Sequence, residues 1–231
     1  MIVQSSFNKT IEESLRRYWS LPSMSDYGQQ TILYKDVAEE IAKLHIVFEQ
    51  TGIKKGDKIA LCSRNMSRWG IAFLATLTYG AVAVPILHEF HPEQIHHIVN
   101  HSESRVLFAG DLVWKKLKAT EMPNLEGIVQ MNDWTLLHAN NEKLKHAVEN
   151  LNLCFGEKYP RNFGIDNITF HNDEAEELAI INYTSGTTSN SKGVMIPYRA
   201  IIGNIMCADE LIGTNAKAGD TLLSMLPLAH T

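Results

Sequence analysis

The chain has 231 residues, 45% of them hydrophobic, which is enough for one large domain or two small domains with a well-buried core. Its formal net charge is −5, and no run of like charges is long enough to form a tail. These properties exclude a basic surface for polynucleotides, so we expect no nucleic-acid partner.

The N-terminal segment lacks the pattern of a signal peptide. Lys9, Glu12 and Glu13 fall where a signal peptide needs an uninterrupted apolar stretch. The three cysteines are far apart and odd in number, so they suit neither a disulfide framework nor a paired-cysteine metal motif. We therefore predict a cytoplasmic protein.

Strands and helices alternate through the first 131 residues. The patterns predict helices at 35–50, from Ser67, at 92–100 and at 111–117, and strands at 58–63, 81–86, 105–109 and 127–131. Such βαβ succession implies an α/β fold with a largely parallel sheet flanked by helices. Its ligands are expected beyond the carboxyl ends of the strands.

Residues 70–87 contain no charged side chain over a length close to that of a membrane span. However, Gly80 and Pro85 interrupt the segment, and Trp69, Phe73 and Leu77 recur at helical spacing before the glycine. We interpret the segment as a helix followed by a short buried strand and predict no transmembrane segment, which leaves peripheral membrane contact open.

The second half of the chain is less regular. Residues 132–177 are polar with few periodic apolar positions, and we interpret them as an excursion from the domain. The most strand-like run follows at 178–182. A helix is predicted at 198–212 and a last strand at 220–226.

The loop YTSGTTSNSKGV, residues 183–194, directly follows the strand at 178–182. Glycines let a backbone turn its N–H groups toward phosphate, short hydroxyls add donors, and a lysine supplies a mobile positive charge. Such donors can hold the charge that builds on the β- and γ-phosphates of ATP when pyrophosphate leaves. We predict a phosphate-binding loop with the ligands Thr184, Ser185, Gly186, Thr187, Thr188, Lys192 and Gly193.

Two other interpretations of this loop are weaker. A surface loop also collects Ser, Thr and Gly, but a set of hydroxyls with a glycine and a lysine directly after a buried strand favours a ligand. A Walker A loop needs GxxxxGK(S/T), whereas the residues that follow Gly186 by five to seven positions are Ser191, Lys192 and Gly193.

The loop resembles the phosphate-binding signature (Y/F)TSGTTGxPKG of the AMP-forming acyl-CoA synthetases, which share their scaffold with luciferases and with the adenylation domains of peptide synthetases. Ser189 replaces the usual glycine and Ser191 the usual proline. The resemblance begins near Thr31 and includes GIKKGDKIALCSRNMSRW and AVAVPILHEFHPEQIHHIVNHSESRVLFAG. These segments are most similar to those of long-chain fatty-acid–CoA ligases.

LPLAH, residues 226–230, is similar to the LPLxH element of this family, which in relatives lies beside the acyl and adenylate site. The resemblance implies a catalytic role for His230. A histidine at a strand end without any role is the alternative, because position alone says little.

The resemblance implies an enzyme that activates a carboxylic acid, in particular a fatty acid, with ATP and then joins it to CoA. It makes residues 1–231 the N-terminal part of the large AMP-binding domain, with the Mg²⁺ ligands and the mobile C-terminal domain outside the chain. We expect these 231 residues to be inactive alone. Two alternatives stay open: an enzyme that loads a carrier-protein thiol, and a non-catalytic nucleotide-binding or interaction module.

Histidines cluster in residues 88–101, and His97 and His101 lie one helical turn apart, which suggests a metal site. No acidic or thiol ligand accompanies them at a useful spacing, and Ile95, Ile98 and Val99 supply an apolar face. We interpret most of these histidines as solvated and predict no metal site. The carboxylates of Glu39, Glu40, Glu174, Glu176 and Glu177 are likewise interpreted as solvated.

Overall fold

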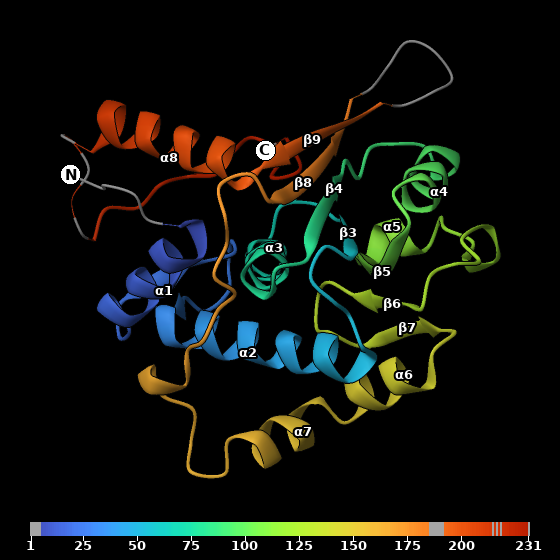
Figure 1. The fold of residues 1–231 in the computed structure, drawn as a ribbon, viewed down its shortest axis with the longest axis horizontal. Coiled ribbons are helices and arrows are strands. Elements are labelled where there is room, and N and C mark those ends of the chain that lie inside the picture. The colour runs from blue at the N-terminus through green and yellow to red at the C-terminus, as the bar shows by residue number, and fades with distance from the viewer. Residues whose placement is uncertain (1–5, 185–191, 214, 216, 218, 231) are drawn as a thin grey trace.

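The structure is a computed structural model that describes residues 6–184, 192–213, 215, 217 and 219–230. Within these residues, a seven-stranded sheet has the order β7-β6-β5-β3-β4-β8-β9 (Figure 1). From β3 onward the strands are β3 (Lys58–Cys62), β4 (Val82–Ile86), β5 (Ser104–Ala109), β6 (Gly127–Gln130), β7 (Leu136–Ala139), β8 (Leu178–Tyr183) and β9 (Gly193–Pro197). The inner five are parallel, while β7 and β9 are antiparallel edge strands. A separate hairpin joins β1 (Pro22–Met24) to β2 (Ile32–Leu33).

Helices cover both faces of this sheet (Figure 1), which confirms the predicted α/β fold. They are α1 (Phe7–Arg17), α2 (Tyr34–Thr51), α3 (Ser67–Tyr79), α4 (Pro92–His101), α5 (Asp111–Trp114), α6 (Glu142–Glu149), α7 (Leu151–Lys158) and α8 (Tyr198–Ile212). Two short 3-10 turns lie at Ala119–Glu121 and Ile165–Asn167.

Alternating side chains of the inner strands supply two separate hydrophobic cores. Leu61 of β3 packs in one core with Phe48 of α2 and Leu77 of α3. The next residue, Cys62, points to the other face and packs in a second core with Ile98 of α4. Strands buried on both faces read as continuous apolar runs, which is why the sequence predicts these strands well.

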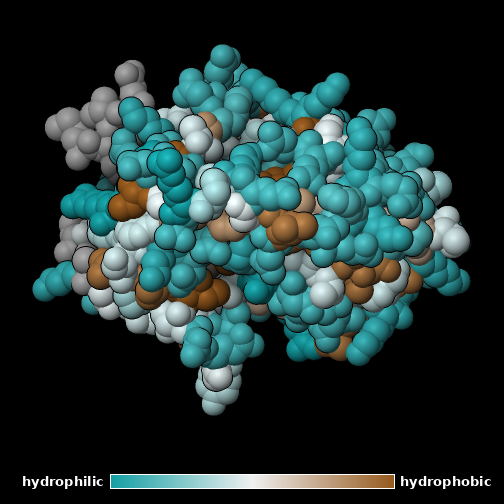
Figure 2. Space-filling view, turned by 90° about the horizontal axis from the view of Figure 1, so that it is seen from below, coloured by the Kyte–Doolittle hydropathy of each residue, from teal (hydrophilic) through white to brown (hydrophobic). Residues whose placement is uncertain are grey.

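Glycines end the two helices that pack on the first face. Gly52 follows α2 with φ of 77°, and Gly80 follows α3 with φ of 86°, a left-handed conformation that glycine adopts without strain. The uncharged segment 70–87 is therefore the rest of α3 followed by β4, as predicted. In the described part of the chain, no helix is both long and apolar enough to cross a membrane. The face seen in Figure 2, opposite the β8–β9 hairpin, is mainly hydrophilic with small separate hydrophobic patches.

Residues 132–177 are more regular than predicted, so their description as an irregular excursion is wrong in part. β7 extends the sheet, and α6 and α7 follow it. Leu144, Ala147 and Val148 of α6 are buried at helical spacing. The helices are only 8 residues each, so the apolar period is too short to stand out from the polar sequence.

Three further elements differ from the sequence prediction. Residues 220–226 form no strand with any other described residue, and Leu222 and Leu223 are 83% and 77% exposed. A strand needs a neighbour for its backbone groups, which an apolar run cannot reveal by itself. Strand β9 and helix α1 were not predicted. Ser67 begins α3 but does not cap it, because its N–H and hydroxyl both donate to Asp26, at 2.9 and 2.6 Å.

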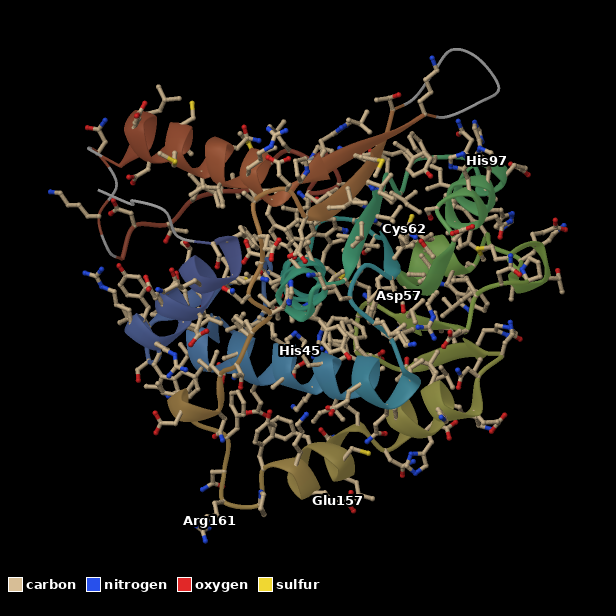
Figure 3. The ribbon with its side chains drawn as sticks, in the orientation of Figure 1. His45, Asp57, Cys62, His97, Glu157 and Arg161 are labelled. Atoms are coloured by element: carbon tan, nitrogen blue, oxygen red, sulfur yellow. The ribbon has the colours of Figure 1, made fainter. Side chains whose placement is uncertain are left out.

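A network of ion pairs links the amino ends of the parallel strands. Arg105, at the start of β5, forms ion pairs with Asp57 and Glu126, and it donates to the Gly52 carbonyl at 2.8 Å. Asp57 is labelled in Figure 3 near the start of β3. This edge is therefore held by ion pairs, and the carboxyl edge carries the candidate site.

Glu177, directly before β8, is not the solvated carboxylate that the sequence suggested. It pairs with Lys55, accepts from His171 Nε2 at 2.9 Å and accepts from the Glu174 backbone N–H at 2.9 Å. Burial alone would raise the pKa of the Glu177 carboxyl, but these hydrogen bonds outweigh it and lower the pKa to about 2.

Because the pKa of Glu177 is low in the folded protein, protonation of Glu177 should account for part of the stability that is lost at acid pH. A carboxyl whose folded pKa is depressed stabilises the fold above its unfolded value of 4.5 and loses that effect as the pH falls through about 2. In Glu177→Gln, the free energy of unfolding should therefore fall less steeply than in the wild type between these pH values. Urea denaturation at several pH values measures this slope. Glu176→Gln is the control, because Glu176 is 77% exposed and pairs with Arg199 at the surface; equal slopes for all three proteins would contradict the assignment.

Candidate functional site

The inner strands are parallel, so their carboxyl ends meet at one edge of the sheet. The residues that follow β8 and β3 at this edge include Thr184 and Asn65. Chemistry-bearing side chains that are far apart in the sequence are therefore brought to the same edge.

The ends of the predicted phosphate loop are held together by the β8–β9 hairpin. Tyr183 pairs with Gly193 across the hairpin, and the Thr184 N–H donates to the Lys192 carbonyl at 3.2 Å. The side chains of Thr184 and Lys192 are exposed. The predicted ligands Ser185, Gly186, Thr187 and Thr188 lie outside the described residues, so their assignment stays a prediction.

Gly193 is also required by the packing of the hairpin, while its predicted contact with phosphate stays a prediction. It is the first residue of β9, and a Cβ placed on it would lie 2.8 Å from Ile181 Cγ2 and 3.2 Å from Tyr183 Cζ. A glycine in a strand often marks such a close approach. The Tyr183 ring thus covers the Gly193 backbone, and any side chain at this position would displace it.

The described donors at the loop base fit a phosphate ligand better than a metal ion. Lys192 supplies an exposed ammonium that forms no ion pair with another described residue, and Thr184, whose backbone N–H donates to the Lys192 carbonyl, adds a hydroxyl at the same end of the hairpin. Within the described ranges, no group of three His, Cys, Asp or Glu side chains could hold a metal ion. The described residues therefore suit the phosphates of ATP and offer no complete Mg²⁺ site.

His230 lies at the exposed end of a turn and donates its backbone N–H to the Pro227 carbonyl at 3.0 Å. Asn65 holds the segment that leads to it: its Nδ2 donates to the Leu226 carbonyl at 2.7 Å and its Oδ1 accepts from the Leu228 N–H at 2.8 Å. The sequence analysis missed Asn65. The signal that could have identified it is an amide side chain three residues after a buried parallel strand.

The histidines of α4 and of the segment before it have separate environments. His96 is buried, its Nε2 accepts from the Lys118 N–H at 3.1 Å, and burial lowers its pKa. His97 and His101 are exposed, and their rings lie 5.6 Å apart. His96 therefore has a structural role and is an exception to the solvated environment expected for most of these histidines.

Comparison with known proteins identifies relatives across nearly the whole chain. The family model described as AMP-binding enzyme matches residues 11–231. A luciferin 4-monooxygenase of Photuris pensylvanica is 23% identical over 208 residues, which are 88% of this chain and 37% of the relative. Fatty acyl-CoA synthetase A of Dictyostelium discoideum is 29% identical over 206 residues, 87% of this chain and 29% of the relative. The chain thus spans about a third of the length of these curated relatives.

The fold is shared with solved structures. The crystal structure of an anthranilate CoA ligase in complex with anthranoyl-AMP superposes with a TM-score of 0.67 at 17% identity, over 92% of this chain and 38% of the ligase. At this identity the likeness concerns the fold. Because the family model covers residues 11–231, the chain belongs to the AMP-binding enzyme family.

Proposed function

We propose that the complete protein, meaning the longest natural polypeptide that contains these 231 residues, is an AMP-forming acid–CoA ligase. A carboxylate oxygen of the acid attacks the α-phosphorus of ATP, and the bond from that phosphorus to pyrophosphate breaks. The CoA sulfur then attacks the acyl carbon, AMP leaves with the bridging oxygen, and the thiol proton passes to solvent. The observation that carries the proposal is the hairpin at the carboxyl edge, which presents Thr184 and Lys192 at the base of the loop YTSGTTSNSKGV.

Each predicted ligand receives a role in this proposal. Lys192, with the hydroxyls of Thr184, Ser185, Thr187 and Thr188 and the backbone of Gly186, would hold the leaving pyrophosphate. Gly193 would keep the loop base closed under the Tyr183 ring. His230 would lie beside the acyl-adenylate, and Mg²⁺ would be held by residues beyond the described ones.

The acid is proposed to be a fatty acid, and the site of action the cytoplasm. The fatty acyl-CoA synthetase among the relatives supports the choice of acid. Transfer of the acyl group to a carrier-protein thiol is the second candidate, because both acceptors share the same first step. Residues 1–231 would form the N-terminal part of the large AMP-binding domain.

Exchange of labelled pyrophosphate into ATP tests the first step, because it needs reversible adenylate formation. In the complete protein, we expect exchange that depends on added acid and rises across fatty acids from short to long chains. CoA and a carrier protein are then compared as acceptors. Exchange that is equal with and without acid would contradict the proposal. The 231-residue chain, assayed in parallel, is expected to be inactive, because we propose that it holds only part of the active site. Efficient thioester formation by this chain would contradict that proposal.

Replacing Asn65 with alanine should disturb the segment that carries His230. The two hydrogen bonds to Leu226 and Leu228 would be lost, each worth about 1 kcal/mol. We expect acid-dependent exchange to fall about 10-fold. The dissociation constant for ATP should change less than about 2-fold, because the substitution leaves the base of the phosphate loop intact. Asn100→Ala is the control, because the Asn100 amide also bonds a backbone carbonyl, that of Glu121, at 2.8 Å. Equal exchange in both variants would exclude the positioning role.

A further inference from the structure

One histidine of the α4 cluster contacts the base of the phosphate loop. His101, the last residue of α4, has its Nδ1 2.7 Å from the hydroxyl oxygen of Tyr183, the last residue of β8. The two rings meet edge to face, with centroids 5.7 Å apart and an interplanar angle of 87°. Figure 1 shows α4 beside the outer end of the β8–β9 hairpin, and Figure 3 labels the neighbouring His97 there.

The hydrogen bond joins a buried hydroxyl to an imidazole nitrogen. Tyr183 is 6% exposed, and burial raises the pKa of its hydroxyl, so the hydroxyl keeps its proton. It can donate to an unprotonated Nδ1 or accept from an Nδ1–H, because a tyrosine hydroxyl does both. In either case the bond holds the hydroxyl end of the Tyr183 ring against His101.

The Tyr183 ring in turn shapes the loop base. It lies over the backbone of Gly193, and the neighbouring Thr184 N–H donates to the Lys192 carbonyl at 3.2 Å. A shift of the ring would therefore move the end of β8 and the start of β9, which the phosphate loop connects. His101 contacts this ring from α4, outside the hairpin, and no other described side chain has a hydrogen bond to the Tyr183 hydroxyl.

We propose that His101 is a positioning residue, which holds the Tyr183 hydroxyl and thereby sets the position of Thr184 and Lys192 for the phosphates of ATP. The inference rests on the proposed function. The Tyr183 hydroxyl belongs to a side chain that is only 6% exposed, and a buried hydroxyl needs a hydrogen-bond partner, which His101 supplies.

Steady-state exchange kinetics with His101→Phe in the complete protein test the inference. Phenylalanine keeps the ring contact and removes the hydrogen-bonding nitrogen. Because the loop holds ATP before and during the reaction, we expect the KM for ATP to rise about 3- to 10-fold, the equivalent of one neutral hydrogen bond, with kcat nearly unchanged. A variant that merely unfolds would instead lose kcat at constant KM. An unchanged KM for ATP would overturn the inference.

Conservative and neighbouring variants separate positioning from general destabilisation. His101→Asn places an amide oxygen near the position of Nδ1 and should recover most of the affinity for ATP. His97→Phe changes an exposed histidine one turn earlier on α4 and should leave KM unchanged. Loss of affinity in His97→Phe equal to that in His101→Phe would overturn the inference.

A double-mutant cycle completes the test. Tyr183→Phe should raise KM as much as His101→Phe, and the double variant should be no worse than either single variant, because all three lack the same bond. Fully additive effects would overturn the inference while leaving the proposed function in place. Wild-type protein without acid-dependent exchange would instead overturn the proposed function, and this inference with it.

Discussion

Replacement of Lys192 by alanine is expected to lower acid-dependent pyrophosphate exchange in the complete protein by about 10²- to 10³-fold, the usual effect of removing a charged group that stabilises developing charge. Lys192 stands exposed at the loop base, with its carbonyl bonded to the Thr184 N–H, and forms no ion pair with another described residue. Its charge is therefore free to act on the pyrophosphate that leaves. Exchange kinetics at saturating acid measure the effect.

Two further variants show whether the charge at this position is what matters. Lys192→Arg keeps a positive charge with a different shape and should retain more exchange than the alanine variant. Lys116→Ala removes an exposed lysine that follows α5 and should exchange at the wild-type rate. If Lys192→Ala exchanged pyrophosphate at a near-normal rate, the role assigned to this lysine would be wrong.

Replacement of Glu40 by alanine is expected to cost about 3 kcal/mol of unfolding free energy, because it leaves the partly buried Arg68 guanidinium and the buried Trp134 indole N–H without their carboxylate partner. Glu40 Oε1 accepts from Lys43 at 2.9 Å, and Oε2 accepts from Arg68 at 3.0 Å and from Trp134 Nε1 at 2.6 Å. Burial opposes ionisation, but these hydrogen bonds and charges outweigh it and lower the pKa of Glu40. One carboxylate thus joins α2, α3 and the turn between β6 and β7.

Thermal unfolding of the domain measures this cost. A loss of about 3 kcal/mol corresponds to a Tm that is lower by about 6–12 °C for a domain of this size. Glu39→Ala is the matched control, because Glu39 is 43% exposed and pairs with the same Lys43 at 3.0 Å. We expect the control to change stability by less than about 0.5 kcal/mol. Equal Tm values for the two variants would show that Glu40 is solvated, as the sequence had suggested.

The fold was predictable where the pattern of the sequence is local. Apolar runs such as 58–62 mark strands buried on both faces, and Gly52 and Gly80 mark helix ends. Where the structure depends on distant partners, prediction failed. The apolar residues 222–226 have no strand to pair with among the described residues, and Glu40 reads as solvated until Arg68 and Trp134 are brought to it.

The candidate site followed the same rule. The loop that contains Lys192 could be proposed as a phosphate site because phosphate binding needs a particular set of residues in one short segment. Asn65 and His101 were missed as contributors, since each acts on a segment far away in the sequence: Asn65 on residues 226–228 and His101 on Tyr183. Gly193 was predicted as a phosphate ligand, and its contact with the Tyr183 ring is a second constraint that only the register of the hairpin reveals.

The fate of the carboxylate oxygens tests the central claim most directly. If the complete protein activates its acid as an acyl-adenylate, a fatty acid labelled with ¹⁸O in its carboxylate must transfer one labelled oxygen to the phosphate of AMP when CoA completes the reaction. Mass spectrometry of the nucleotide product should therefore find AMP that carries one ¹⁸O atom per thioester formed. Unlabelled AMP, or ADP in its place, would contradict adenylate formation and with it the role proposed for the loop around Lys192.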